Sequence, residues 1–431
     1  MLYYLLLFFI HSIRSEQEVI EDGRKLVMIT ALWRHGSRAP SSMMKNDWFN
    51  KNNFDWPQGG GGRGQLDTIG MEQQIRLGEQ IRQRYIEGKP YKFLNDFYKS
   101  NEIYIRSTDV NRTIVSAISN MLGMYGEVRY HNRPGIDYPV DKYWPEGFVP
   151  IPIHSVENYR DSMFNIACTY IDDLFHLAEK TPQYQAYYTD PELVKEYKFL
   201  SQQFGEEINS SNYWKIIDSL KIENTFYPDL LRNHSPWFTN ERMKVWDGLH
   251  RKHMAFFMGI GLDDTLVDGI DVQTEMNKIR AGYNLGEIFD RFDQKLNCQN
   301  STDRKCMYFN NLKYYAYSAH DLTLFGLLAG LGYTDEVLPV GDTPDYTSAI
   351  FFELWQDSKT DEPTVRILYR KGPEDNLNTS YSQVLPACGG HEFCRLDDLR
   401  KQWAKFKPVK PFEELCWQHV DPVKINTGTD G

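Results

Sequence analysis

A histidine flanked by arginines follows an apolar segment near the N-terminus. Residues 26–33 read Leu-Val-Met-Ile-Thr-Ala-Leu-Trp, and Arg34, His35 and Arg38 come directly after them. The apolar run has no helical period, which predicts a buried strand. At the carboxyl end of such a strand, two guanidinium groups can bind phosphate oxygens while His35 acts as an acid, base or nucleophile. The pattern indicates anion chemistry, although a basic surface cluster after a core strand is the alternative.

A second arginine follows a second short apolar segment. Residues 103–105 predict a strand, and Arg106 stands at its carboxyl end. Asp109 then precedes an apolar periodic stretch over 110–122, which predicts a helix capped by that aspartate. Strand, arginine and helix thus repeat the arrangement seen at Arg34, which makes Arg106 a second candidate functional residue. A capping or surface arginine is the alternative.

Titratable residues also end a third predicted strand. Residues 313–319 are followed by His320 and Asp321, and the apolar run 322–331 predicts a buried helix. The stretches 349–355 and 364–369 predict two further paired strands of the same sheet. The sequence therefore predicts an α/β fold in which three strands carry charged residues at their ends.

Taken together, these segments resemble the histidine acid phosphatase family, a branch of the histidine phosphatase superfamily. The blocks Arg-His-Gly-x-Arg-x-Pro at 34–40, Arg-Ser-Thr-Asp-x-x-Arg-Thr at 106–113 and His320-Asp321 stand in the order of that family. Residues 62–66 and Gly70 resemble the glycine-rich segment that follows the family's active-site loop. The resemblance spans roughly residues 26–416 and covers the middle of the chain only weakly.

The resemblance implies a phosphoglycerate mutase-like α/β core sheet flanked by helices, with a smaller, mostly helical inserted lobe. We expect the core domain over 16–155 and 290–420, because the proline-rich stretch near 139–152 is typical of a domain exit and 279–288 resembles the family's return to the core. The inserted lobe would then cover 156–289, and 421–431 would form a flexible tail.

By the same resemblance, the protein is expected to be an acid phosphatase that hydrolyses phosphate monoesters through a phosphohistidine intermediate. No cofactor or metal is implied, because arginines neutralise the phosphate charge. The implied roles are His35 as nucleophile, Asp321 as proton donor, Arg34, Arg38, Arg106 and His320 as phosphate-binding residues, and His154 as a possible pocket wall.

The chain departs from the family pattern at two positions near the first motif. Ser37 stands where many relatives carry Asp, and Asp67 stands where the family usually has Thr. The first change could alter leaving-group preference or the pH profile, and the second has no interpretation from sequence. Two alternative functions are a phytase-like inositol polyphosphate phosphatase and a catalytically inactive secreted binding protein. The pair His250 and His253 could suggest a metal site, but without a third ligand at a recognisable spacing a packed or solvated face is favoured.

Composition and the N-terminus favour the secretory pathway. The 431 residues carry a formal net charge of −11 and a pI near 5.5, which argues against a nucleic-acid partner and suits an acidic compartment. The apolar block 2–10 predicts a signal peptide over 1–15, and no later segment predicts a membrane anchor. We therefore expect an extracellular or lysosomal protein that acts on small phosphate monoesters, with a homodimer left open.

Six cysteines agree with an oxidising compartment, although the sequence alone leaves their connectivity open. The resemblance implies a local Cys388–Cys394 bridge and a long-range Cys168–Cys416 bridge, and Cys298 and Cys306 flank a polar turn that a third bridge could close. Acceptor triplets for glycosylation begin at Asn209, Asn233, Asn300 and Asn378, whereas the one at Asn111 falls in a predicted buried helix and is discounted.

Overall fold

A computed structural model describes residues 18–56, 62–126, 130–163, 168–262, 266–332, 336–339 and 341–421 of the chain. The predicted signal peptide, residues 59–61 of the glycine-rich stretch and the predicted tail beyond residue 421 lie outside these ranges. No helix in the described ranges is both long and apolar enough to cross a membrane.

One mixed sheet forms the centre of the core domain. Its strand order is β3-β6-β2-β7-β8-β9, with β1 paired to the start of β2. Strands β3, β6 and β2 are parallel, whereas β7, β8 and β9 are antiparallel to their neighbours. The strands are β1 Ile20–Glu21, β2 Arg24–Arg34, β3 Ile103–Ser107, β6 Tyr314–Ala319, β7 Ala349–Asp357, β8 Pro363–Arg370 and β9 Cys394–Arg395.

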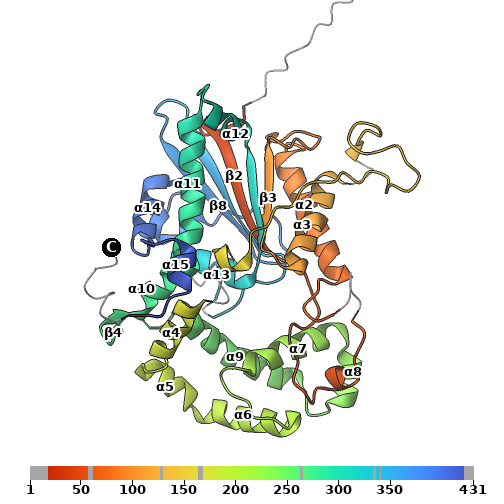
Figure 1. Cartoon of the computed structure of the whole chain (residues 1–431), viewed down its shortest axis with the longest axis vertical. Helices are drawn as coiled ribbons and strands as arrows, with labels where there is room; N and C mark the ends of the chain where they lie inside the picture. The colour runs from red at the N-terminus through yellow and green to blue at the C-terminus, as the bar shows by residue number, and fades with distance from the viewer. Residues whose placement is uncertain are drawn as a thin grey trace, which may run out of the picture.

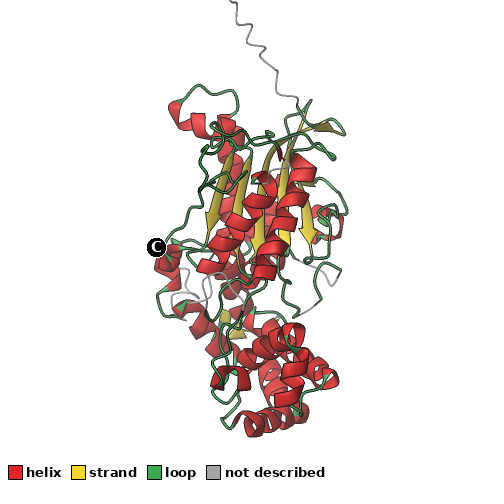
Figure 2. Cartoon of the chain, turned by 90° about the vertical axis from the view of Figure 1, so that its right-hand side faces the viewer, coloured by secondary structure: helices red, strands yellow, loops and turns green. Residues whose placement is uncertain are grey.

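Helices cover both faces of this sheet, as Figures 1 and 2 show. Helices α2 (Thr68–Tyr85) and α3 (Asn111–Tyr125) pack against one face through a cluster that includes Trp33. Helices α11 (Tyr283–Cys298), α13 (Asp321–Gly330) and α14 (Leu396–Ala404) cover the other. Because β2 is buried on both faces, its sequence is a continuous apolar run without alternation. The α/β core and the five predicted strands are confirmed.

A helical lobe with its own apolar core lies at one end of the sheet (Figure 1). Its helices are α4 Thr169–Ala178, α5 Pro182–Tyr188, α6 Pro191–Phe204, α7 Tyr213–Phe226, α8 Pro228–His234 and α9 Asn240–Phe257. The boundaries differ from those predicted. Residues 43–56, with α1 (Trp48–Lys51), pack into the lobe, because Met43, Met44 and Phe49 join its core.

The chain also returns to the sheet earlier than residue 290. A π-helix (Lys278–Gly282) follows α10 (Val272–Asn277) and continues into α11, and Ala281 and Leu285 already belong to the core of the sheet layer. The apolar face of α11 explains the early return, since it is buried against the sheet along its length.

His250 and His253 lie inside the lobe among aromatic rings. The ring of His253 is edge-on to Phe175, and that of His250 is edge-on to Tyr213. Burial lowers the pKa of His250 to about 3 and that of His253 to about 4, so both are neutral even in an acidic compartment. Within the described ranges, no group of three or more His, Cys, Asp or Glu side chains could hold a metal ion.

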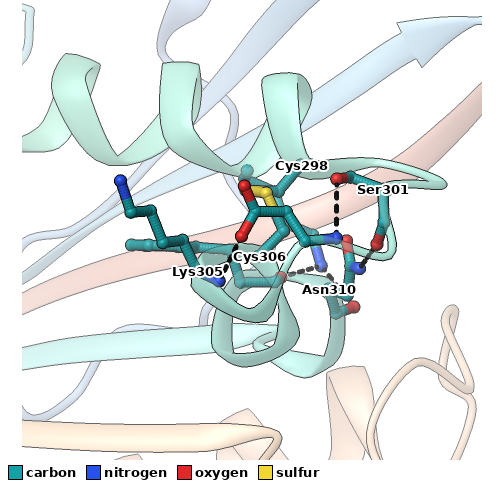
Figure 3. Close-up of a disulfide and its surroundings, with 8 residues drawn as sticks. Cys298, Ser301, Lys305, Cys306 and Asn310 are labelled. Atoms are coloured by element: carbon teal, nitrogen blue, oxygen red, sulfur yellow. Dashed lines mark hydrogen bonds between the residues drawn. A yellow bond between two sulfur atoms is a disulfide. The ribbon is translucent and has the colours of Figure 1, made fainter.

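The structure pairs the six cysteines as the sequence analysis expected. Cys298 and Cys306 close the end of α11, where Ser301 and Asn310 hold the turn through the 2.8 Å bond from the Asn310 amide to the Ser301 carbonyl (Figure 3). Cys388 pairs with Cys394, and the bridge Cys168–Cys416 ties the start of α4 to α15 (Phe412–Cys416).

The four candidate glycosylation sites are exposed: Asn209, Asn233, Asn300 and Asn378. Asn111 is exposed too, at the first position of α3, because that end of the helix faces solvent rather than the core.

Candidate active site

Most of the predicted site residues lie at, or just after, the carboxyl ends of the three parallel strands, at the lobe end of the sheet (Figure 1). His35 follows β2, and His320 follows β6. Thr108 follows β3 and leads into α3. Parallel strands end at the same edge of a sheet, so segments distant in sequence meet there.

The loop after β2 is held from several sides. The His35 amide donates to the Ala319 carbonyl at 3.1 Å, and its own carbonyl accepts from the Thr347 amide at 3.2 Å. The loop also lies against the start of α2 so closely that a Cβ atom on Gly36 would come within 2.2 Å of the Gly70 carbonyl oxygen. Only glycine fits at this contact, which explains why both motif segments carry one.

His35 is buried and neutral. Its Nδ1 lies 2.8 Å from the Gly36 carbonyl oxygen. Because a carbonyl only accepts, Nδ1 must carry the proton, which leaves the lone pair on Nε2. Burial, together with the positive charges of Arg112, Arg34 and Arg38, holds the pKa of His35 well below its usual value. A neutral imidazole with Nε2 unprotonated is the nucleophilic form.

Three arginines surround this histidine: Arg34, Arg38 and Arg112. A 2.8 Å ion pair joins Arg34 to Asp321, and Arg38 makes two 3.0 Å bonds to Asp218. The Nε–H groups of all three arginines are buried and find no acceptor among the described residues. Buried donors of this kind are normally satisfied, so three of them around one histidine favour an anion site here.

Arg106, expected in this set, lies elsewhere. It forms ion pairs with Asp161 and, at 2.9 Å, with Glu287 on α11. Its guanidinium lies 5.7 Å from the centre of the Tyr317 ring, its neighbour in register on β6. These partners satisfy its charge away from His35.

Arg112 takes the place that the sequence analysis gave to Arg106. It stands in the first turn of α3, and one of its terminal nitrogens lies 3.4 Å from His320 Nδ1. Burial and then the charges of Arg38 and Arg34 lower its pKa to about 10. Both arginines belong to the block 106–113. The sequence therefore identified the segment that contributes to the site, but not which of its two arginines lies beside His35.

His320 is oriented by a chain of hydroxyl groups. The Thr113 hydroxyl has a main-chain carbonyl as acceptor for its one proton, so it accepts from the Thr108 hydroxyl. The Thr108 hydroxyl in turn accepts from His320 Nε2 at 3.0 Å. This leaves Nδ1 as the acceptor that faces Arg112. Burial, with Arg112, lowers the pKa of His320 to about 3. In this arrangement His320 orients Arg112.

Asp321, the first residue of α13, lies at the edge of the site and pairs with Arg34. Burial raises the pKa of its carboxyl group, but the charges of Arg34 and Arg38 outweigh that effect and hold the pKa below its usual value. Asp321 is therefore ionised in the free site even at mildly acidic pH.

His154 does not face the site. Its main chain pairs with β3, and its exposed ring stacks on Tyr104 with 4.3 Å between ring centres. The proline-rich segment adds a short pairing to the edge of the sheet, which turns this side chain outward.

The two departures from the family pattern contact each other. The Ser37 hydroxyl donates to Asp67 Oδ2 at 2.8 Å, and Asp67 Oδ1 accepts from the Gly70 amide at 2.7 Å as the N-cap of α2. Against the family pattern expected from the sequence, Asp at 37 and Thr at 67, this chain carries the hydroxyl and the carboxylate the other way round, and the two bond to each other. We therefore expect the two departures to compensate each other.

Exchanging the two residues tests this compensation. In S37D/D67T the hydrogen bond re-forms with its direction reversed, because Thr is also a good N-cap, so we expect near wild-type melting temperature and phosphatase activity. The single variant S37D places two buried carboxylates in contact and should lower stability by about 1–3 kcal/mol. Thermal melting and kcat/KM check this, and a double variant no better than S37D would refute it.

Comparisons with known proteins agree with the fold and motifs. The family description "Histidine phosphatase superfamily (branch 2)" matches residues 25–370. "Putative acid phosphatase 11" of Caenorhabditis elegans is 31% identical and covers 92% of this chain and 94% of its own, and human lysosomal acid phosphatase is 29% identical over 91% and 81%.

Among solved structures, the apo form of Hafnia alvei phytase has a TM-score of 0.57 at 15% identity, covering 93% of this chain and all of its own. At that identity, the likeness concerns the fold. The family match over most of the chain and the acid phosphatase relatives carry the assignment: this protein is a histidine acid phosphatase and belongs to branch 2 of the histidine phosphatase superfamily.

Proposed function

We propose that the protein hydrolyses small phosphate monoesters in an acidic compartment through a phosphohistidine on Nε2 of His35. One observation carries this proposal: the unpartnered Nε–H groups of Arg34, Arg38 and Arg112 lie around a histidine that is held neutral. Phosphoryl transfer needs such preorganised positive charge around the equatorial oxygens and a nucleophile opposite the leaving group.

In the first half-reaction, Nε2 of His35 attacks phosphorus and the ester P–O bond breaks. The electron pair moves to the leaving oxygen, which takes the proton of Asp321 and departs as an alcohol. In the second half, the Asp321 carboxylate takes a proton from water, and the water oxygen attacks phosphorus. The P–N bond breaks, its electrons return to Nε2, and inorganic phosphate leaves.

Acidic conditions follow from the state of Asp321. In the free site it is ionised and paired with Arg34. A bound phosphate competes for Arg34 and adds negative charge, so it raises the pKa of Asp321 and prepares the protonated acid that the first step needs.

Residues 1–15 are proposed as a secretory signal, and exposed Asn209, Asn233, Asn300 and Asn378 as glycosylation sites. Lysosomal acid phosphatases among the relatives support an extracellular or lysosomal location. Neither the phytase-like nor the inactive alternative has a specific observation in its favour, and the complete set of arginines around His35 speaks against the second.

Hydrolysis of p-nitrophenyl phosphate at acidic pH with excess EDTA tests the proposal. We expect turnover by the wild type and none by H35A, because nothing else in the motif can replace the nucleophile. A stable phosphohistidine signal after acid-free quenching should appear in the wild type alone. Turnover by H35A, or activity that only added zinc or magnesium restores, would refute the scheme.

Arg112 and Arg106 make a matched pair of variants. R112A should lower kcat/KM by about 10²–10³, the loss typical of one charge-stabilising donor. R106A should act mainly on stability, because it leaves the buried Asp161 carboxylate without its ion-pair partner, whereas Glu287 keeps Arg291. Steady-state kinetics and thermal melting separate the two outcomes. The reverse result would return Arg106 to the phosphate site.

Asp321→Asn removes the proton donor and keeps the shape of the side chain. We expect a loss of about 10²–10⁴ in kcat for alkyl phosphates and a smaller loss for p-nitrophenyl phosphate, whose leaving group needs little protonation. Equal losses on both substrates would argue against the role of Asp321 as acid.

The variant D321N also tests how phosphate binding depends on pH. Because phosphate raises the pKa of Asp321, binding takes up a proton. Inorganic phosphate should therefore bind best at acidic pH and weaken as pH rises through the pKa of Asp321 in the complex. D321N should show a flatter dependence, with only the ionisation of phosphate itself remaining.

A further inference from the structure

Asp218 is a carboxylate that the helical lobe places at the phosphate site. It stands on α7, whose residues Ile216, Ile217 and Leu220 are buried in the lobe core. Its side chain nevertheless reaches across to the loop that follows β2, 180 residues away in the sequence. No sequence pattern pointed to it.

The contact between Asp218 and Arg38 has the geometry of an orienting clamp. Oδ2 accepts from Nη1 and Oδ1 from Nη2, both at 3.0 Å, so the carboxylate fixes the plane of the guanidinium. Oδ2 also accepts from the Ser41 amide at 3.2 Å. The side chains are only 9% and 18% exposed, so solvent competes little with the pair.

This clamp leaves one edge of Arg38 for a ligand. Nη1 also donates to the Ala39 carbonyl at 3.0 Å, so both terminal nitrogens are engaged by protein acceptors. Nε is buried and has no acceptor among the described residues. Arg34 follows the same plan, with Asp321 and the Pro344 carbonyl on its terminal nitrogens and its Nε without an acceptor.

The course of the chain explains why the carboxylate comes from the lobe. Directly after Arg38 the chain leaves the sheet, and Met43 and Met44 enter the lobe core beside α7. Arg38 therefore stands at the junction of core and lobe, where an acceptor on its outer side must come from α7.

We infer that Asp218 is a positioning residue of the phosphate site, which aims the Nε–H edge of Arg38 at the phosphate, so that the lobe is a working part of that site. This inference rests on the proposed function for the identity of the ligand. If the inference holds, replacing Asp218 changes the affinity for phosphate only when Arg38 is present.

A double-mutant cycle on R38A, D218A and R38A/D218A tests this dependence. The readouts are the affinity for inorganic phosphate by titration calorimetry and kcat/KM for p-nitrophenyl phosphate. D218A should lower the affinity for phosphate by about ten- to a hundredfold, which is the loss expected when a positioned group is slightly misplaced. In the R38A background it should cause no further loss, because the group it orients is gone. Arg34 and Arg112 keep residual affinity measurable there.

Three controls distinguish a loss of positioning from a general loss of structure. D218N should lose less than D218A, because its amide oxygen can still accept from one nitrogen of Arg38, and it decides the matter if D218A fails to fold. D247A removes another ion-paired carboxylate from the lobe, on α9, where Asp247 pairs with Lys221 and Arg251, and should leave phosphate affinity unchanged. Melting temperatures identify any variant whose loss is only structural.

Equal losses from D218A in both backgrounds would overturn the inference, as would unchanged or tighter phosphate binding, which would make Asp218 a bystander or a competitor of phosphate. A wild type that binds phosphate but does not turn over p-nitrophenyl phosphate would instead refute the proposed function. The binding arm of the cycle would still test Asp218 in that case.

Discussion

Mutual repulsion among three guanidinium groups in one buried pocket is the constraint on which the rest of the site depends. Burial, and then the charges of Arg38 and Arg34, lower the pKa of Arg112 to about 10, so its positive charge is costly in the free site. A bound anion relieves this cost, so the same repulsion that destabilises the free site favours phosphate. The protein surface is acidic overall, with a net charge of −11, and positive charge is therefore local to the pocket.

The fold meets this constraint by giving each cation an anchor from a different segment. Arg34 is held by Asp321 at the start of α13, Arg38 by Asp218 of the lobe, and Arg112 by His320. Parallel pairing of β3, β6 and β2 brings these segments to one edge of the sheet. The tight contact between the loop after β2 and α2 then fixes the nucleophile relative to the cations. Sheet and lobe therefore both contribute side chains to the pocket.

Much of this could be read from the sequence, because the core strands are apolar on both faces and end abruptly in charged residues. The strands before Arg34 and His320 and the motifs around them were predicted on that basis. The sequence could not show in the same way which of Arg106 and Arg112 lies beside His35. Arg106 is the fourth residue of β3, and its register against Tyr317 points it at Glu287, a partner 181 residues away. Such long-range carboxylates leave no local pattern, and neither does Asp218, which reaches the site only because α7 packs over it. The lobe boundaries were missed for the same reason, since residues 43–56 look like loop until a second core covers them.

Asp321 connects the electrostatics of the site with its chemistry. As a carboxylate it neutralises Arg34 in the free site, and it is therefore in competition with the substrate phosphate for that arginine. In the proposed mechanism, protonation ends the competition, frees Arg34 for phosphate oxygens and creates the acid that the leaving group requires. Binding and proton donation thus draw on one ionisation, which makes acidic pH favourable to both at once. The proposed histidine nucleophile stays usable under these conditions because burial, together with the nearby arginines, keeps His35 neutral. In the proposed mechanism, the three arginine charges thus account both for the affinity for phosphate and for a nucleophile that stays neutral in acid.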